Sequence, residues 1–361
     1  MPEFIDSWDY SDLNCMRPRR NRFYVIGAGT VLTGGVHHMT IDEQEYREMY
    51  RVMRRVRAFE NAAAELWEEG EIHGELHLAN GHEAVAAGIS AHLREEDSVA
   101  ATHRAHNAAI AKGVDIKPML AEILGRETGL SRGKGGHMHL FDPETNFGCS
   151  GIIGAGLPLS LGPGLAADLE GTDAVSVAYL GEGAANQGSF HESLNMASVW
   201  DLPVIFVIED DKWAVSMTKG ETTAVDSNTD RAIGQDMPGL SVNGMNPRDV
   251  SAAAGYAVQR ARNGAGPTLI EAECYHYSGH FEALPQEALA PDELEEWRER
   301  DPLPQARQEL RDEFGVSEDD LDAIDSEVRD EVDEAVEFAL DSPLPDAEVG
   351  LENVFAEEGS V

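Results

Sequence analysis

Lysine is scarce in this sequence, and basic residues of any kind are few. Five lysines occur among 27 basic residues, against 67 acidic residues, and the formal net charge is −40. Binding to nucleic acid or to an anionic membrane surface requires cationic contacts, so the charge excludes both as partners. An acidic excess of this size is typical of proteins in high salt, where the Debye length falls to about 3 Å at 1 M. We therefore expect a cytoplasmic protein of a halophile.

Cysteine is also rare, and long apolar runs are absent. Three cysteines, at positions 15, 149 and 274, give neither a disulfide framework nor the spacing of a zinc site. No apolar run approaches the ~20 residues that span a bilayer. The chain has 361 residues, enough for one large domain or two with an ample core. We therefore expect a globular protein without a membrane partner.

The first 38 residues allow three interpretations. Arg19–Arg20 precede the apolar run Phe23–Val36, as in a twin-arginine export signal. Gly27–Gly29 look like the start of a dinucleotide-binding motif, which would make the chain a nicotinamide dehydrogenase, but the third glycine is missing. We favour a third interpretation, in which translation starts at Met39. Residues 1–38 are then an extension that is not part of the fold.

The stretch Val175–Ser216 predicts a strand, a helix and a second strand. The expected elements are a buried strand at Val175–Leu180, a helix that begins at a capping box of Ser189 and Glu192 and ends near Trp200, and a buried strand at Pro203–Ile208. A short right-handed crossover makes the two strands parallel neighbours. This pattern predicts an α/β protein with a parallel sheet flanked by helices.

Further helices and one further strand are predicted outside this stretch from apolar periodicity and end signals. These elements are a helix from a capping box of Thr40 and Glu43 to Gly70, helices at Ala155–Ala167, Asn246–Gly264 and Ser317–Leu340, and a buried strand at Thr268–Ala272. The helix at Ser317–Leu340 has apolar residues on one face and carboxylates elsewhere. We therefore expect its apolar face to pack on the rest of the protein.

Carboxylates follow both strands of the central stretch. Glu182 follows the first strand, and Glu209–Asp211 follow the second. In an open parallel sheet the carboxyl ends of neighbouring strands open into one crevice, where ligands usually bind. Mg²⁺ prefers oxygen ligands and often shares them with phosphate groups. The glycines near Glu182 do not have dinucleotide spacing, so the pattern favours a metal ion that bridges a diphosphate.

This stretch resembles the thiamine-diphosphate signature, in which G-[DE]-G is followed, after a crossover, by Asn-Asn. The run QGSFHESLNMASVWDLPVIFVIE is similar to the alpha subunit of the thiamine-dependent first component of 2-oxo acid and acetoin dehydrogenase complexes. The similarity covers roughly Thr40–Leu303, and with the acidic composition it suggests a haloarchaeal member. It implies a thiamine-diphosphate-binding α/β domain at 39–282 and an acidic helical C-terminal region at 283–361 packed on it.

The resemblance also implies a set of cofactor-binding residues. Arg104 would grip the diphosphate, because a guanidinium pairs bidentately with phosphate oxygens. His103 stands where the family has Tyr, and Gly151 would lie near the aminopyrimidine. Ile153 corresponds to the bulky residue that holds thiamine in its bent shape. The remaining implied cofactor contacts are Gly183, Ala184, Asp211 and His280.

Metal and catalytic roles follow from the same resemblance. It assigns Mg²⁺ to Glu182, Asp211 and the backbone carbonyl of Trp213. His280 matches the histidine that faces the diphosphate and the thiazolium, so we expect it to be catalytic. A neutral imidazole there suits orientation or proton relay near neutral pH.

Several positions depart from the family pattern. In the motif Gly81–Ala84, His82 replaces the usual Gln, and for Glu83 and the preceding His77 the sequence leaves a structural role and a site role open. Asp211 stands where the second Asn of the signature is usual, which adds negative charge beside the diphosphate. The loop Ala283–Pro291 lacks the arginine found in the family.

The carboxylate that promotes ylide formation on thiamine comes from a beta subunit in two-chain members. We therefore expect this chain to be inactive alone and to work in an α₂β₂ heterotetramer. The tetramer would decarboxylate a 2-oxo acid, either pyruvate or a branched-chain one, and pass the acyl group to a lipoyl-bearing acyltransferase component. One alternative is an acetoin dehydrogenase alpha subunit, which Gly279–Glu282 resemble. Another is a catalytically silent scaffold or regulatory paralogue, which His103, Asp211 and the missing loop arginine favour.

Overall fold

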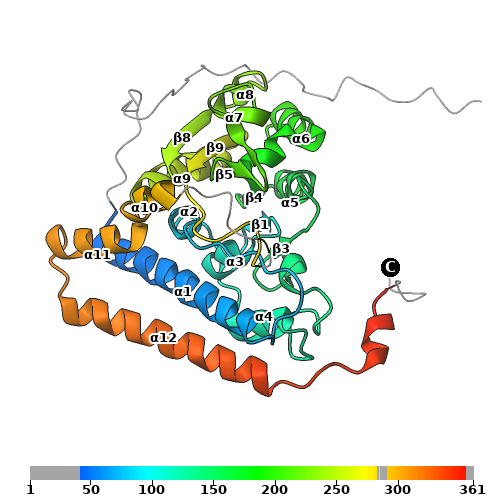
Figure 1. Cartoon of the computed structure of the whole chain (residues 1–361). Helices are drawn as coiled ribbons and strands as arrows, with labels where there is room; N and C mark the ends of the chain where they lie inside the picture. The colour runs from blue at the N-terminus through cyan, green and yellow to red at the C-terminus, as the bar shows by residue number, and fades with distance from the viewer. Residues whose placement is uncertain (1–40, 283, 285–290, 355–361) are drawn as a thin grey trace, which may run out of the picture.

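The computed structural model describes residues 41–282, 284 and 291–354 (Figure 1). Three expectations for residues 1–38 therefore lie outside the described residues: the export signal, the dinucleotide motif and the alternative start at Met39. Most of the loop Ala283–Pro291 lies outside them as well.

A seven-stranded sheet forms the centre of the protein, in the order β2-β3-β1-β4-β5-β9-β8. Its strands are β1 (Ser98–Ala101), β2 (Phe141–Asp142), β3 (Phe147–Cys149), β4 (Ser176–Gly181), β5 (Val204–Asp210), β8 (Gly239–Asn243) and β9 (Thr268–Glu273). Every pairing is parallel except that of β2 with β3. The short strands β6 (Trp213–Ala214) and β7 (Met217–Thr218) form a separate antiparallel pair. The predicted class, a mainly parallel sheet flanked by helices, is confirmed.

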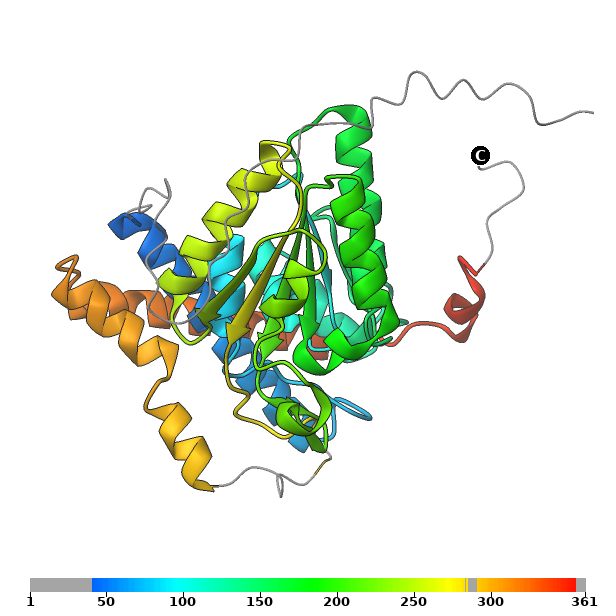
Figure 2. The same ribbon diagram turned by 90° about the horizontal axis from the view of Figure 1, so that it is seen from above.

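Helices cover both faces of this sheet, as Figure 2 shows. On one side lie α5 (Gly156–Glu170) and α6 (Gly188–Val199), and on the other lie α1 (Glu43–Glu68), α2 (Glu83–Ser90), α3 (His106–Lys112) and α9 (Pro247–Arg262). The remaining helices are α4 (Ile116–Ile123), α7 (Lys219–Thr222), α8 (Thr229–Ile233), α10 (Pro291–Arg298), α11 (Pro302–Asp312), α12 (Glu318–Asp341) and the 3₁₀ helices η2 (His137–His139), η3 (Glu182–Asn186) and η4 (Ala347–Leu351).

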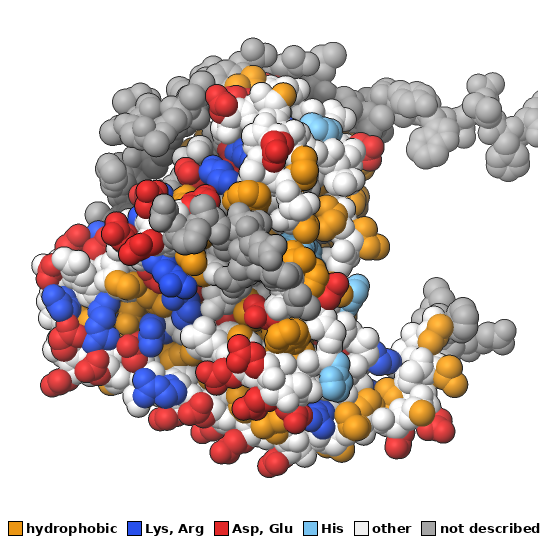
Figure 3. All heavy atoms as spheres, in the orientation of Figure 1, with side chains coloured by type: hydrophobic (Ala, Val, Ile, Leu, Met, Phe, Trp, Pro, Cys, Tyr) orange, Lys and Arg blue, Asp and Glu red, His pale blue; other side chains and the backbone are white. Residues whose placement is uncertain are grey.

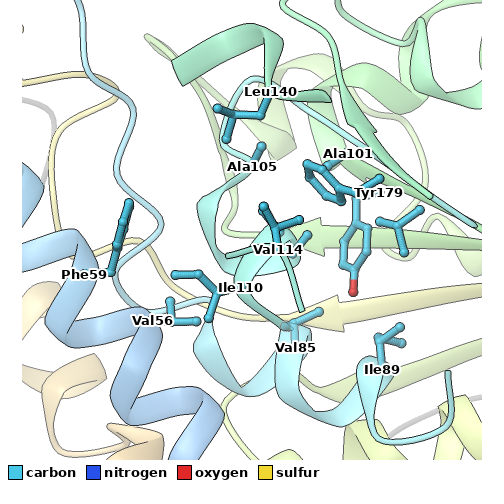
Figure 4. Close-up of a cluster of buried hydrophobic side chains, with 14 of the residues drawn as sticks. Val56, Phe59, Val85, Ile89, Ala101, Ala105, Ile110, Val114, Leu140 and Tyr179 are labelled. Atoms are coloured by element: carbon cyan, nitrogen blue, oxygen red, sulfur yellow. The ribbon is translucent and has the colours of Figure 1, made fainter. Parts of the chain in front are cut away.

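The central strands are apolar throughout because both of their faces are buried. Successive side chains of a strand point to opposite faces. Accordingly Val177 and Tyr179 of β4 join the cluster under α1, α2, α3 and α9, part of which is shown in Figure 4. Ala178 and Leu180 join the cluster under α5 and α6. The carboxyl end of β4 is therefore held from both sides.

The predicted helices are present, but both capping boxes were wrong. The cap of α1 is Asp42 with Glu45, whose backbone N–H groups and carboxylates bond reciprocally at 2.9 and 3.0 Å, and Thr40 lies outside the described residues. Helix α6 begins at Gly188, and its first residues have no side-chain cap. Ser189 donates instead to the carbonyl of Gly154 at 3.3 Å. The chain enters α6 directly from η3, which leaves Ser189 inside the first turn.

Helices α11 and α12 pack along α1, as Figures 1 and 2 both show. Their contact is the third apolar cluster, which includes Met49 and Met53 of α1, Leu310 of α11, and Leu321 and Val328 of α12. The apolar face predicted for this last helix is therefore buried, while its carboxylates lie on the surface (Figure 3). None of the helices in the described part of the chain combines the length and apolar character needed to cross a membrane.

Candidate active site

A pocket of ≈ 270 Å³ opens at the carboxyl ends of β1, β4 and β5. It brings together nine of the predicted site residues: His103, Arg104, Ile153, Glu182, Gly183, Ala184, Asp211, Trp213 and His280. Gly151 does not line the pocket itself but lies between two residues that do, Ser150 and Ile152. Segments from five parts of the chain thus converge on one cavity, as the parallel sheet requires.

Two carboxylates stand in this pocket with little to neutralise them. Glu182 is 2% exposed, and its Oε1 atom has no hydrogen-bond partner among the described residues. Burial, followed by the charges of Asp211 and Asp210, raises the pKa of Glu182 to about 9. Burial also raises the pKa of Asp211, although His82 and Arg104 oppose the shift. A cation bound between these groups would remove the cost of burying them, so their arrangement fits a metal ion.

A tight turn after β5 sets the position of Asp211. Lys212 has a φ of 70° and Val215 a φ of 59°, in the left-handed region that residues with a side chain rarely adopt. Within this turn the backbone N–H of Trp213 donates to Asp211 Oδ1 at 3.0 Å. A side chain at Gly183 would meet the Cβ atom of Ala214 at 2.7 Å. Glycine at 183 thus lets the end of β4 and the turn after β5 approach each other.

A buried ion network, which the sequence gave no means of predicting, lies beside the pocket. Lys219 is 7% exposed, and its Nζ atom donates to Asp210 at 2.5 Å and to Glu271 at 2.9 Å. Glu271 also accepts from the backbone and side-chain amides of Asn228, at 2.9–3.0 Å. Lys212 Nζ donates to Asp210 at 2.9 Å. The network ties the segment after β7 to β5 and β9, directly behind Asp211.

Arg104 is buried at the base of the pocket, where the sequence placed a diphosphate contact. Its guanidinium donates to the carbonyl of Leu78 and, at 3.0 Å, to the carbonyl of His280, and it lies 2.9 Å from His276 Nε2. Burial lowers the pKa of Arg104, and the nearby carboxylates, beginning with Asp211, oppose that effect. The guanidinium therefore brings positive charge to the pocket and also fixes the backbone that carries His280.

Four histidines form a cluster, the histidine wall, of which His103 and His280 line the pocket. Ring nitrogens of His77, His103 and His280 lie within 4.8 Å of one another, and His77 Nδ1 is 2.8 Å from His137 Nε2. Burial, with added repulsion from Arg104, lowers the pKa of His103 and of His280 to about 4. Neutral imidazoles at these distances could ligate a transition metal, but the guanidinium beside them favours an anion instead.

These contacts decide the two roles that the sequence left open. His77 belongs to this histidine wall through its contacts with His103 and His280, although it does not itself line the pocket. Glu83 is structural, because its carboxylate accepts from Arg57 and, at 2.9 Å, from the backbone N–H of Gly81. His137 and His276 were missed altogether. His137 stands in the glycine-rich stretch Ser131–Asp142 and His276 four residues before His280, and both stretches resemble family motifs, which is the signal that could have found them.

His82 lies against the carboxylates of the pocket. Its Nδ1 atom is 3.5 Å from Glu209 Oε1, and its Nε2 atom is 3.9 Å from Asp211 Oδ2. Burial alone would lower the pKa of His82, but Glu209 and Asp211 raise it above its ordinary value. His82 is thus part of the site, although the sequence identified it only as a departure from the family motif.

The family of the chain follows from its similarity to known proteins. The dehydrogenase E1 component family matches residues 50–348 of the chain. The chain belongs to this family. The match runs well beyond Leu303, where the sequence resemblance weakened, and includes all of α11 and α12.

Relatives within the E1 family have names of two kinds. The alpha subunit of acetoin:2,6-dichlorophenolindophenol oxidoreductase from Bacillus subtilis (strain 168) is 42% identical over 309 residues, which cover 85% of this chain and 92% of that protein. The pyruvate dehydrogenase E1 component subunit alpha from Rhizobium meliloti (strain 1021) is 41% identical over 299 residues, with coverage of 82% and 86%. The chloroplastic pyruvate dehydrogenase E1 component subunit alpha-3 from Oryza sativa subsp. japonica is 38% identical over 331 residues, which cover 89% of this chain and 78% of that protein. The predicted function, an E1 alpha subunit, is confirmed at the level of the family.

Proposed function

We propose that this chain is the alpha subunit of a thiamine-diphosphate-dependent 2-oxo acid dehydrogenase. The observation that carries the proposal is a pair of carboxylates that follow β4 and β5, the buried Glu182 and the half-buried Asp211, facing a pocket that also holds Arg104. A site that combines two acids with a buried guanidinium suits a cation and a polyanion bound together. This is the requirement of a magnesium diphosphate.

In this proposal, the residues at the pocket either hold the metal ion or contact the cofactor. Glu182, Asp211 and the backbone carbonyl of Trp213 hold Mg²⁺, and Gly183 and Ala184 contact the cofactor beside them. Arg104, His103 and His280 bind the diphosphate, with Gly151 and Ile153 at the thiamine rings. The unpartnered Oε1 atom of Glu182 supports the metal role, because a buried carboxylate without a partner is costly. The bound cofactor supplies the carbanion chemistry of decarboxylation.

His280 is the proposed catalytic residue. Its pKa of about 4 keeps the ring neutral at pH 7, so it can accept or donate one hydrogen bond without adding charge. Arg104 donates to its backbone carbonyl at 3.0 Å, which holds the residue at the pocket. The neutral ring can therefore orient the substrate or relay a proton beside the thiazolium.

A beta subunit is the proposed partner, and apolar side chains at the edge of the pocket support it. A second groove, of ≈ 610 Å³, shares Ala101, Ser150 and Gly156 with the pocket and runs along α5. Ile152 is 72% exposed at the pocket, and Leu159 is 62% exposed in the groove. A subunit seated there would reach the Gly151 end of the pocket, where the missing carboxylate is needed. We further propose that the two subunits form an α₂β₂ assembly in the cytoplasm of a halophile, with a lipoyl-bearing acyltransferase as the acceptor of the acyl group. Within this chain, we propose a cofactor-binding domain at 39–282 and a C-terminal region at 283–361.

Binding and turnover of the paired subunits test this function. The chain would be produced with a cognate beta subunit, and thiamine diphosphate would be titrated calorimetrically at saturating Mg²⁺ in high salt. We expect saturable binding by the pair, no turnover by the alpha chain alone, and acyl transfer to a lipoyl domain with a 2-oxo acid. A pair that binds no cofactor at saturating Mg²⁺ would instead identify a silent scaffold paralogue.

Acetoin is the second candidate substrate, and the relatives support it. Two acetoin:2,6-dichlorophenolindophenol oxidoreductase alpha subunits are each 42% identical to the chain. The same reconstituted pair, assayed with pyruvate, branched-chain 2-oxo acids and acetoin, separates the two candidates. Exclusive turnover of acetoin would replace the 2-oxo acid proposal but leave the cofactor site unchanged.

A further inference from the structure

Two of the positions at which this chain departs from the family pattern lie side by side. The family motifs described above have Gln at the position of His82 and Asn at the position of Asp211. Both of those side chains are uncharged amides. Here one is an imidazole and the other a carboxylate, and they belong to motifs far apart in the sequence. Their Nε2 and Oδ2 atoms nevertheless lie 3.9 Å apart.

The ring of His82 lies close to two acidic side chains. It stands at the start of α2, is 3% exposed, and lines the pocket. Neither of its ring nitrogens has a hydrogen-bond partner among the described residues, yet each has a carboxylate oxygen, of Glu209 or Asp211, within 4 Å. Leaving a buried polar atom unpaired costs about 1–3 kcal/mol. The position of the His82 ring must therefore be favoured by another interaction, and the two nearby carboxylates are the groups that can supply it.

The two acids that precede Asp211 in the chain, Glu209 and Asp210, already have partners. Asn107 donates to Glu209 at 2.8 Å, and Lys219 donates to Asp210 at 2.5 Å. Among the described residues, the hydrogen bond that Asp211 receives comes from the backbone of Trp213, to Oδ1. Its Oδ2 atom faces His82. The carboxylate of Asp211, one departure from the family pattern, thus lies next to the imidazole of His82, the other departure.

We propose that His82 and Asp211, which stand where the family motifs have Gln and Asn, are a matched pair. The ring of His82, with its Nε2 atom 3.9 Å from Oδ2, packs against the Asp211 carboxylate and holds it in place at the pocket. His82 is therefore a positioning residue that acts through Asp211. The inference rests on the proposed function. It adds that the chain keeps its metal site with Asp at position 211 because His stands at position 82.

A double-mutant cycle tests the pair. The variants are His82→Gln, Asp211→Asn and the double variant, which restores the family's residues at both positions. The measured quantity is the dissociation constant of thiamine diphosphate at saturating Mg²⁺, by calorimetry on the complex with the beta subunit. His82→Gln should weaken binding about 10-fold, as the loss of an outer partner of a metal ligand does. Asp211→Asn should weaken it by a similar factor, because the amide then faces a histidine that matches a carboxylate. The double variant should bind within about 3-fold of the wild type, because neither partner is then left unpaired.

Independent effects would overturn the inference. If His82 only fills space, the two losses multiply to about 100-fold in the double variant. Single substitutions without effect on binding would overturn it equally. The control is the same cycle between Asp211→Asn and His92→Gln, a histidine bonded at 2.8 Å to Ser251, outside the pocket. That control cycle should be additive.

A second readout separates failure of this inference from failure of the proposed function. Without any cofactor, the midpoints of urea unfolding of the same four proteins give a coupling between residues 82 and 211 in the free chain. We expect the double variant to be more stable than the sum of the single effects predicts. A wild type that binds no thiamine diphosphate would refute the proposed function, while additive midpoints would refute the matched pair whether or not cofactor binds.

Discussion

Two groups of acids stand at the carboxyl edge of the same sheet, and their surroundings differ. Asp210 and Glu271 are each bonded to Lys219, and Glu271 also accepts from Asn228. Glu182 and Asp211, which line the neighbouring pocket, have few protein partners. Burial raises the pKa of Glu182 to about 9, whereas Ser227, Lys219 and Asn228 lower that of Glu271 against the effect of its burial. The first group completes its own bonding and supports the fold, while the second is complete only with a ligand.

The structural group should show the largest effect on stability. Lys219→Met leaves Asp210 and Glu271 buried without their shared cation, so the free energy of unfolding should fall by about 3–5 kcal/mol. Urea unfolding in high salt measures this change. Lys117→Met is the matched control: its ammonium makes an exposed pair with Glu334 at 2.9 Å, and its loss should leave the free energy of unfolding nearly unchanged. Equal losses for the two variants would show that Lys219 is not an essential part of the network.

The site group should show the opposite behaviour. Glu182→Gln removes the charge of a buried carboxylate whose Oε1 atom has no hydrogen-bond partner among the described residues, so the free energy of unfolding of the cofactor-free chain should stay the same or rise. Affinity for thiamine diphosphate at saturating Mg²⁺ should fall at least about 100-fold, because a metal ligand is lost. Calorimetry and urea unfolding measure the two quantities. Glu192→Gln, on the exposed surface of α6, should change neither. Normal affinity in Glu182→Gln would remove Glu182 from the metal site.

The histidines of the pocket sharpen the comparison through pH. The pKa of His103 falls from 6.5 to about 4 in the folded chain, mainly by burial. Its unfolded form therefore binds a proton first, and the stability that the neutral ring contributes above pH 6.5 is lost as the pH falls towards 4. His103→Tyr should reduce the loss of unfolding free energy between pH 7 and pH 5 by about 1 kcal/mol, allowing for partial exposure. Urea unfolding at both pH values measures it.

The control for this pH effect is His191→Tyr, an exposed position on α6. Comparison with the wild type at each pH is essential, because protonation of the acidic surface changes stability in every variant. If His103→Tyr and His191→Tyr shift the pH dependence equally, the histidine wall does not respond to pH as its burial implies.

The sequence was most informative where local pattern and burial coincide. The apolar runs of β4 and β5 predicted two buried parallel strands, and the register that pairs Gly181 with Glu209 puts the acids after them together. The pattern was least informative about helix starts. Ser189 and Glu192 have the spacing of a capping box, but the first turn of α6 already contains Ser189. A capping motif fixes a spacing, and only the path of the preceding chain decides which residue stands at the end of the helix.

Side chains that meet across the fold were beyond prediction from sequence alone. Lys219 begins the short helix α7 and Glu271 stands in the apolar strand β9, and neither segment has a pattern that indicates contact with the other. The same holds for His77, in the loop before α2, and His137, in η2. His82 was noticed as a departure, yet its significance depends on the proximity of Asp211.

By itself, the sequence determined the parallel α/β class, the family and the strand ends where acids gather, because apolar periodicity and ordered motifs are local properties of the chain. The tertiary structure decided which acids are already neutralised and which still face a pocket. That difference depends on distances of a few ångströms between segments far apart in the sequence. Electrostatic pairing inside a protein is set by such distances and by burial, which no single segment encodes.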